Sequence, residues 1–229
     1  MTRSIIFDFD GTLAIGHGPV VAYARELASV ARVGFVARVE EALSSFESGH
    51  SDYLDGYQVV AELAARDGVP SGTMSKAYLA SREMLGTAEA PVNAPAGLAE
   101  LLRTLSEHAT IHVATNAPAT GVERVFDTWG VGDFIDHLHV NAGKPEGLYP
   151  IIRDALATGP VMAVGDIVAN DLQPALDLGA DTALVGATAV TSGADVTMRG
   201  ASLTDLHDAL VSWAQREPRP TAKGTHHHA

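Results

Sequence analysis

From residue 98 onward, short apolar runs alternate with segments whose apolar residues fall at helical spacing. Strands separated by helices pair in parallel, because a tight hairpin cannot connect them. We therefore predict an α/β fold, with a parallel sheet that helices cover on both faces. One predicted strand begins at residue 4, and the others lie at residues 110–115, 137–140, 160–164 and 182–185. The predicted helices of this part begin near residue 98 and lie at residues 122–129, 148–156, 172–178 and 203–213.

Between residues 15 and 93 this alternation stops. Four helical patterns follow one another, at residues 20–27, 36–46, 57–65 and 74–85. Four helices placed after the first strand predict an inserted helical bundle. We expect a catalytic core of residues 1–14 and 94–216, with residues 15–93 forming a helical cap. Residues 217–229 hold two prolines and a run of three histidines, and we expect a disordered tail there.

Two carboxylates mark the end of the first predicted strand. Asp8 and Asp10 stand in the sequence Asp-Phe-Asp-Gly-Thr, and an extended strand sends side chains at i and i+2 the same way. Ligands of open α/β sheets bind just beyond the carboxyl ends of the strands. Two ionised carboxylates about 4 Å apart repel by roughly 4 kcal/mol at an effective dielectric near 20. The pair therefore needs a shared proton or a cation such as Mg²⁺, which prefers oxygen ligands.

Polar residues also follow the later predicted strands. Thr115 and Asn116 offer a hydroxyl and an amide that could bind phosphoryl oxygens, and Lys144 offers a point charge for the same group. Asp166 and Asp171 add two carboxylates after the strand at residues 160–164. Taken singly, each has a common structural explanation, such as a turn, a surface lysine or a helix cap.

Composition excludes several classes of protein. The chain has no cysteine, so thiolate metal sites, disulfides and cysteine nucleophiles are excluded. The apolar runs are far shorter than the roughly 20 residues that span a bilayer, and the early acids interrupt any signal peptide, so we expect a cytoplasmic protein without a membrane partner. The net charge of −13 argues against nucleic acid but leaves a small phosphorylated substrate possible.

Taken together, the polar residues resemble the four motifs of the haloacid dehalogenase superfamily, and the predicted bundle resembles its type-1 helical cap. The motifs are Asp8-x-Asp10-Gly11-Thr12, Thr115-Asn116, Lys144-Pro145, and Gly165-Asp166 with Asn170-Asp171. The chain departs from the common pattern at Ile167, where serine is frequent, and at Pro174, where glycine is frequent. The resemblance implies a Rossmann-like core and a Mg²⁺-dependent phosphomonoester hydrolase.

The resemblance also implies a role for each residue. Asp8 would attack phosphorus and form an aspartyl-phosphate, and Asp10 would act as acid and then as base. Thr115, Asn116 and Lys144 would bind the phosphate. The Mg²⁺ ligands would be the carboxylates of Asp8 and Asp166 and the backbone carbonyl of Asp10, with Asp171 as a ligand or a support for one.

Two alternatives stay open beside the phosphatase. A sugar-phosphate phosphomutase would use the same core with a different cap, and a non-catalytic protein that binds a phospho-ligand could share the fold. Dehalogenating members lack the second aspartate, so Asp10 favours phosphate esters.

Substrate choice is expected to lie in the cap, at residues 15–19 and 48–55. The residues expected to decide it are His17, His50, Asp52 and Tyr53. As a weaker hypothesis, Asp52 and Asp55 would favour a substrate with a cationic group. The substrate itself, its pathway and the oligomeric state are not readable from the sequence.

Overall fold

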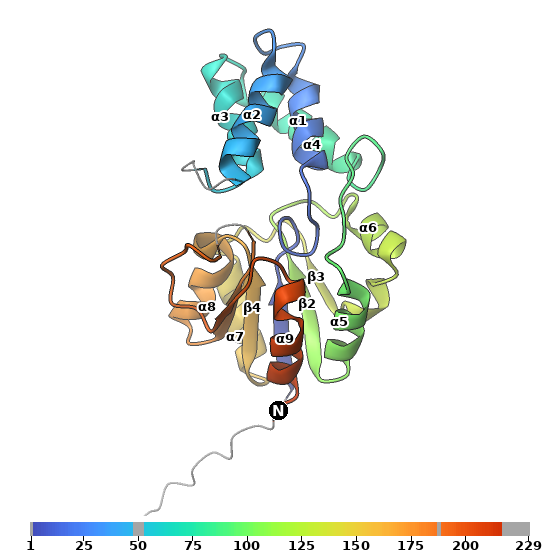
Figure 1. The fold of residues 1–229 in the computed structure, drawn as a ribbon, viewed down its shortest axis with the longest axis vertical. Coiled ribbons are helices and arrows are strands. Elements are labelled where there is room, and N and C mark those ends of the chain that lie inside the picture. Colours follow the sequence, from blue (N-terminus) through green and yellow to red (C-terminus); the bar gives the residue numbers. More distant parts are fainter. Residues whose placement is uncertain (1, 48–52, 187–188, 217–229) are drawn as a thin grey trace, which may run out of the picture.

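A computed structural model describes residues 2–47, 53–186 and 189–216 (Figure 1). The predicted tail at residues 217–229 lies outside the described residues, as do His50 and Asp52. The described chain forms a sheet with flanking helices and, beyond one end of the sheet, a group of four helices.

Over the described residues the sheet has six strands, and every pair of neighbours is parallel. In spatial order the strands are β3 (His137–His139), β2 (Ala109–Ala114), β1 (Arg3–Phe7), β4 (Val161–Gly165), β5 (Asp181–Leu184) and β6 (Met198–Arg199). Ile6 of β1 is in register with His112 on one side and with Ala163 on the other. Because the strands are parallel, their carboxyl ends meet at one edge of the sheet, and in Figure 1 this edge faces the four helices.

Apolar side chains on both faces of β1 explain why helices cover both sides. Ile5 and Phe7 belong to one buried cluster and Ile6 to another, because alternate residues of a strand point to opposite faces. The first cluster is covered by α5 (Leu98–Ser106), α6 (Val122–Trp129) and α9 (His207–Ala214). The second is covered by α7 (Leu148–Leu156) and α8 (Gln173–Asp177). The predicted α/β fold is confirmed.

The four helices between β1 and α5 form what we call the helical insert. They are α1 (Gly18–Leu27), α2 (Phe35–Glu47), α3 (Gly56–Arg66) and α4 (Ser71–Glu83). They share an apolar cluster of their own, to which Tyr23, Val39 and Val60 belong. Two connections join the insert to the sheet, and they pair with each other where Ile15 and Asn93 exchange backbone hydrogen bonds of 2.9 Å.

Some local structure differs from the sequence-based expectation. Strand β6 was not predicted, because it is a two-residue strand with no apolar run. The helix expected at residues 172–178 is a π-helical turn, Val168–Leu172, followed by α8, and the closing helix begins as a 3-10 turn, Thr204–Leu206. A further 3-10 turn, Gly132–Phe134, follows α6. Of the described helices, none combines the length and apolarity needed to cross a membrane.

Candidate active site

The turn after β1 brings Asp8 to the carboxyl edge of the sheet. The Asp8 backbone N–H donates to the Val164 carbonyl at 2.8 Å, which extends the pairing of β1 with β4 by one residue. The turn then passes very close to Asp166, because a Cβ on Gly11 would lie 2.2 Å from the Asp166 Oδ2 atom. Gly11 also has a φ of +90°, which L side chains rarely adopt. Both the backbone conformation and the lack of room for a side chain therefore require a glycine at this position.

Three carboxylates converge beyond the ends of β1 and β4. Asp8, Asp166 and Asp171 each offer an oxygen, and these oxygens all lie within 4.8 Å of one another. The Asp166 Oδ1 atom is buried and has no hydrogen-bond partner among the described residues. An unpartnered buried oxygen beside two more carboxylates is the donor set that suits a hard divalent cation. The residues present therefore fit a Mg²⁺ site.

Lys144 is the cation that the protein itself supplies to this cluster. Its Nζ atom lies 2.5 Å from Asp8 Oδ1 and 2.7 Å from Asp171 Oδ1, and all three side chains are buried. The backbone of Lys144 is held by the side-chain amide of Asn116, whose Oδ1 accepts from the Lys144 N–H at 2.7 Å and whose Nδ2 donates to the Lys144 carbonyl at 3.3 Å. The side chain of Asn116 thus positions Lys144. The neighbouring Thr115 is buried, and its hydroxyl accepts from the Ala117 N–H at 3.0 Å.

Burial and mutual repulsion set the protonation of the cluster. Burial raises the pKa of Asp8 to about 7, even though Lys144 opposes the shift. Burial, followed by the charges of Asp8 and Asp171, raises the pKa of Asp166 well above its usual value. Burial alone would lower the pKa of Lys144, but the charges of Asp8 and Asp171 outweigh it and raise that pKa. One ammonium does not balance three ionised carboxylates, so the cluster has room for further positive charge.

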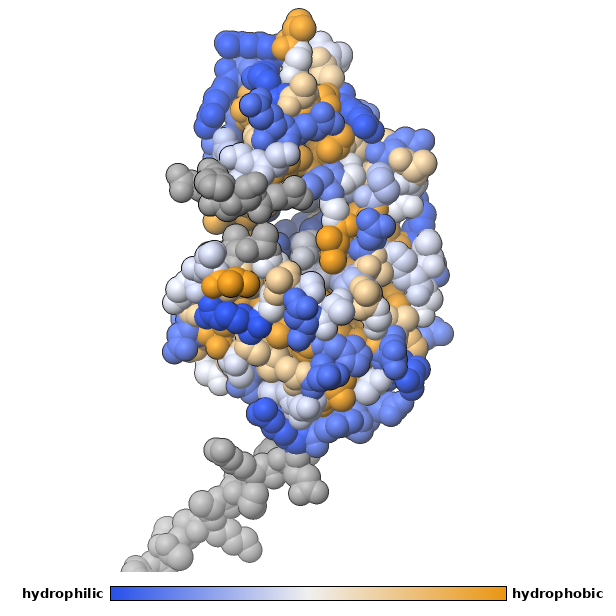
Figure 2. Space-filling view, in the orientation of Figure 1, coloured by the Kyte–Doolittle hydropathy of each residue, from blue (hydrophilic) through white to orange (hydrophobic). Residues whose placement is uncertain are grey.

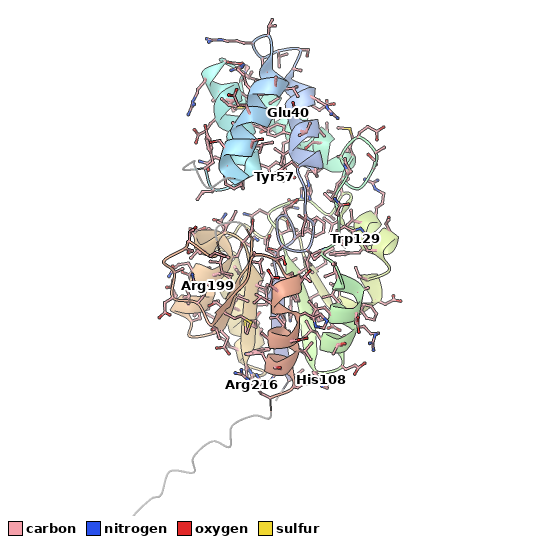
Figure 3. The ribbon with its side chains drawn as sticks, in the orientation of Figure 1. Glu40, Tyr57, His108, Trp129, Arg199 and Arg216 are labelled. Carbon is pink, nitrogen blue, oxygen red and sulfur yellow. The ribbon has the colours of Figure 1, made fainter. Side chains whose placement is uncertain are left out.

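Asp10, the second carboxylate of the turn, has partners from the insert. Arg82 of α4 donates from Nη1 to Asp10 Oδ1 at 2.6 Å and to the Tyr57 hydroxyl at 2.6 Å. The Tyr57 hydroxyl in turn donates to Asp10 Oδ1 at 3.4 Å. Figure 3 shows Tyr57 at the end of the insert that faces the sheet. The sequence analysis identified neither residue, although Arg82 lies on the buried face of α4 with Ala77 and Ser81, where a surface arginine would not be expected.

These groups surround a pocket of about 550 Å³. Figure 2 shows the surface hollowed where the insert meets the rest of the molecule. Of the sequence-predicted site residues, the pocket lining brings together Asp8, Asp10, His17, Thr115, Asn116, Lys144, Asp166 and Asp171. The insert adds Val20, Phe46, Asp55, Gly56, Tyr57 and Tyr78, so three of its six contributed residues are aromatic. Tyr53 packs against the apolar cluster of the insert and does not belong to the lining.

Asp55, which we hypothesised to favour a substrate with a cationic group, has a structural role. Asp55 caps α3, where its carboxylate accepts from the Gln58 N–H at 2.7 Å. Its pKa is raised by burial, and it lines the same pocket as Asp10. A cap that is already bonded is a poor candidate for a dedicated cation receptor.

The sequence pattern of the haloacid dehalogenase-like hydrolases matches residues 2–179, which is most of the chain. The chain belongs to this hydrolase family. The predicted membership is therefore confirmed, and the match spans the turn after β1, the insert and the turn after β4. No protein with a curated description matches the chain.

Solved structures of the family share the fold. CbbY of Rhodobacter sphaeroides, in complex with phosphate, is 17% identical with a TM-score of 0.64, covering 93% of this chain and 100% of its own. YfnB of Bacillus subtilis, described as bound to magnesium and as revealing interdomain movement, is 15% identical with a TM-score of 0.62, covering 91% and 98%. A haloacid dehalogenase (HAD) phosphatase of Thermococcus onnurineus is 16% identical with a TM-score of 0.55, covering 91% of this chain and 98% of its own. At these identities the likeness shows a common fold.

Proposed function

We propose that this hydrolase cleaves phosphate monoesters of small metabolites, with Asp8 as the nucleophile and Mg²⁺ as the cofactor. The observation that carries the proposal is the convergence of Lys144 and two further carboxylates, Asp166 and Asp171, on Asp8 in the lining of a pocket, with Asp10 on the same turn. Phosphoryl transfer depends mainly on positioning and charge neutralisation, which this arrangement suits. The proposal also assigns residues 15–93 the role of a cap that excludes water from the pocket.

The carboxylates of Asp8, Asp166 and Asp171 and the backbone carbonyl of Asp10 would hold Mg²⁺. The metal would neutralise charge on the phosphoryl oxygens and allow the carboxylates to be ionised together. The unpartnered Asp166 Oδ1 atom and the raised pKa of Asp8 support this assignment. The magnesium described for YfnB supports it by family likeness.

In the first step an Asp8 oxygen bonds to phosphorus, and the bond between phosphorus and the ester oxygen breaks. The leaving oxygen takes a proton from Asp10, which ends the step as a carboxylate. Lys144 and the Thr115 hydroxyl bind the phosphoryl oxygens, and Asn116 keeps Lys144 in place. In the second step Asp10 takes a proton from water, the water oxygen bonds to phosphorus, and the bond to Asp8 breaks. Phosphate leaves and both aspartates return to their starting states.

The first experiment measures Mg²⁺-dependent phosphate release from p-nitrophenyl phosphate. We expect release that stops with EDTA and falls at least about 100-fold in Asp8→Asn, because the amide is not a nucleophile. Arg66→Gln is the matched control, since this arginine pairs with Glu62 on the surface of α3, away from the pocket. Release that survives both EDTA and Asp8→Asn contradicts the proposal. Conversion of a sugar phosphate to an isomer without net phosphate release would identify a phosphomutase instead.

A further inference from the structure

Arg82 is the most completely buried charged side chain at the junction between the insert and the sheet. Its side chain has an exposed fraction of 0%, whereas the Asp10 side chain that it meets is 29% exposed. An unpaired buried guanidinium is costly by several kcal/mol. Burial alone would lower the pKa of Arg82, but the charge of the adjacent Asp10 outweighs it and raises that pKa. Arg82 therefore carries its charge at every physiological pH, and in the proposed reaction it stabilises the carboxylate that Asp10 becomes when its proton passes to the leaving oxygen.

The side-chain hydrogen bonds of Arg82 leave from a single nitrogen. Its Nε and Nη2 atoms are buried and have no hydrogen-bond partner within the described ranges. Its two hydrogen bonds both leave from Nη1, one to Asp10 and one to Tyr57. The rings of Phe9 and Tyr57 lie about 6 Å from the guanidinium carbon, at 6.0 and 5.9 Å. The guanidinium thus lies near two aromatic rings and binds one carboxylate oxygen.

The end of α4 that carries Arg82 is fixed to the rest of the molecule. Arg124 of α6 donates from Nη2 to the carbonyls of Glu83 and Leu85, each at 2.7 Å. Leu85 belongs to the apolar cluster under α5 and α6 rather than to that of the insert. A cation at a helix C-terminus that binds the last carbonyls stabilises that end. Arg82 therefore approaches Asp10 from an anchored point of the insert.

We propose that Arg82, together with Tyr57, is a positioning residue that holds Asp10 for proton transfer to the leaving group. Asp10 and Tyr57 line the pocket, whereas Arg82 lies behind them and acts through them. The contact joins the insert to the acid and base of the reaction, so the placement of Asp10 depends on the placement of α3 and α4. This inference rests on the proposed function, in which Asp10 protonates the leaving oxygen.

The test uses a series of substituted phenyl phosphates, from p-nitrophenyl to p-methoxyphenyl phosphate, with the full chain and Mg²⁺. The series keeps the shape of the leaving group while its need for a proton rises. The quantity measured is kcat/KM, which reports the step in which the leaving group departs. For Arg82→Gln we expect kcat/KM to fall by less than about 3-fold with p-nitrophenyl phosphate and by about 10-fold or more with p-methoxyphenyl phosphate. In Asp10→Asn the fall in kcat/KM should also grow along the series.

Three further variants separate positioning from folding. In an Asp10→Asn background, Arg82→Gln should add less than about 2-fold, because residues that act as one unit are not additive. Arg82→Lys should recover part of the loss, since it keeps the charge. Tyr57→Phe removes one hydroxyl and leaves the ring, so it should steepen the series to a smaller degree, and it carries the test if Arg82→Gln does not fold. Arg66→Gln should leave the series unchanged.

A loss of equal size across the series, or a full additional loss in the Asp10→Asn background, overturns the positioning role, because either result describes a general structural defect. If Asp10→Asn loses the same factor of kcat/KM with every substrate of the series, the assignment of Asp10 as the acid fails, regardless of the result for Arg82→Gln. If Asp10→Asn steepens the series and Arg82→Gln, Arg82→Lys and Tyr57→Phe do not, only the inference about Arg82 fails.

Discussion

The ammonium of Lys144 lies 2.5 Å from the carboxylate of Asp8, and both side chains are nearly closed off from water. The same ammonium lies 2.7 Å from Asp171, so one cation serves two buried anions. In the proposed reaction this ammonium is also the group that meets the incoming phosphate. The Lys144 ammonium therefore both stabilises the site and binds the substrate. Removing its charge should lower both the stability of the protein and its turnover.

Lys144→Met should lower the free energy of unfolding by about 3 kcal/mol in EDTA, because it leaves two buried carboxylates without their partner. Added Mg²⁺ should recover part of that loss. Phosphate release should fall by about 100-fold. Urea denaturation and a phosphate assay measure the two effects. Lys76→Met, an exposed lysine of α4, is the matched control and should change neither. Equal stability of Lys144→Met and wild type in EDTA would contradict the account of the buried pair.

The raised pKa of Asp8 predicts how the stability of the metal-free protein depends on pH. The folded carboxyl titrates at about 7, and an unfolded one at its ordinary value of 3.8, so the folded state binds the extra proton between these values. Its contribution to stability is present below pH 3.8 and is lost as the pH rises toward 7. His112, whose pKa burial lowers to about 4, acts in the opposite direction.

The contribution of Asp8 is therefore measured as a difference between wild type and Asp8→Asn. In EDTA the stability of wild type relative to Asp8→Asn should fall between pH 4 and pH 7, by an amount on the order of a few kcal/mol. Thermal unfolding at a series of pH values follows it. Mg²⁺ should flatten the difference, because a bound cation favours the ionised carboxylate. A difference that stays constant with pH in EDTA would contradict the raised pKa.

Gly11→Ala should lower the affinity for Mg²⁺ as well as the stability of the protein. The new Cβ would lie 2.2 Å from Asp166 Oδ2, at a φ of +90°. Gly97→Ala is the matched control, since Gly97 also has a positive φ, +77°, but a Cβ there has no neighbour within 4 Å. Both variants should lose about 1–2 kcal/mol of stability from the backbone conformation. Only Gly11→Ala should also lose Mg²⁺ affinity, measured by calorimetry, and equal affinity in the two variants would contradict the prediction.

Asn116→Ala should reduce activity through Lys144. The amide of Asn116 bonds to both the N–H and the carbonyl of the Lys144 backbone, so its loss frees the lysine to move. We expect KM for p-nitrophenyl phosphate to rise by about 10-fold, with a smaller fall in kcat. Asn116→Asp keeps the acceptor for the Lys144 N–H, so its KM should lie between those of wild type and Asn116→Ala. Unchanged KM in Asn116→Ala would show that Lys144 is held by other contacts.

The sequence was sufficient to predict the parallel sheet and most residues of the pocket. Asp8, Thr115 and Asp166 each follow a strand, and parallel strands end at one edge, so residues distant in the chain could be expected to meet. Strand β6 could not be expected, because Met198 and Arg199 form no apolar run and pair only where β5 has already been placed.

Arg82 shows the other limit of sequence-based prediction. An arginine near the end of a helix is ordinarily exposed, and only the packing of α4 against Asp10 and Tyr57 makes it part of the site. Asn116 was assigned to the phosphate because an amide after a strand can bind an oxygen, but its side chain is used by the backbone of Lys144. Contacts between two loops depend on their tertiary approach, which spacing in the chain does not encode.

The central claim is that Asp8 carries the phosphoryl group between the two steps. The most direct test is rapid-quench mass spectrometry of Asp10→Asn with p-nitrophenyl phosphate, because that leaving group needs little help from an acid whereas the second step needs a base. We predict a burst of about one p-nitrophenol per enzyme and a phosphoryl group on the peptide that contains Asp8. Turnover without a burst, or a phosphoryl group on any other residue, would contradict the claim.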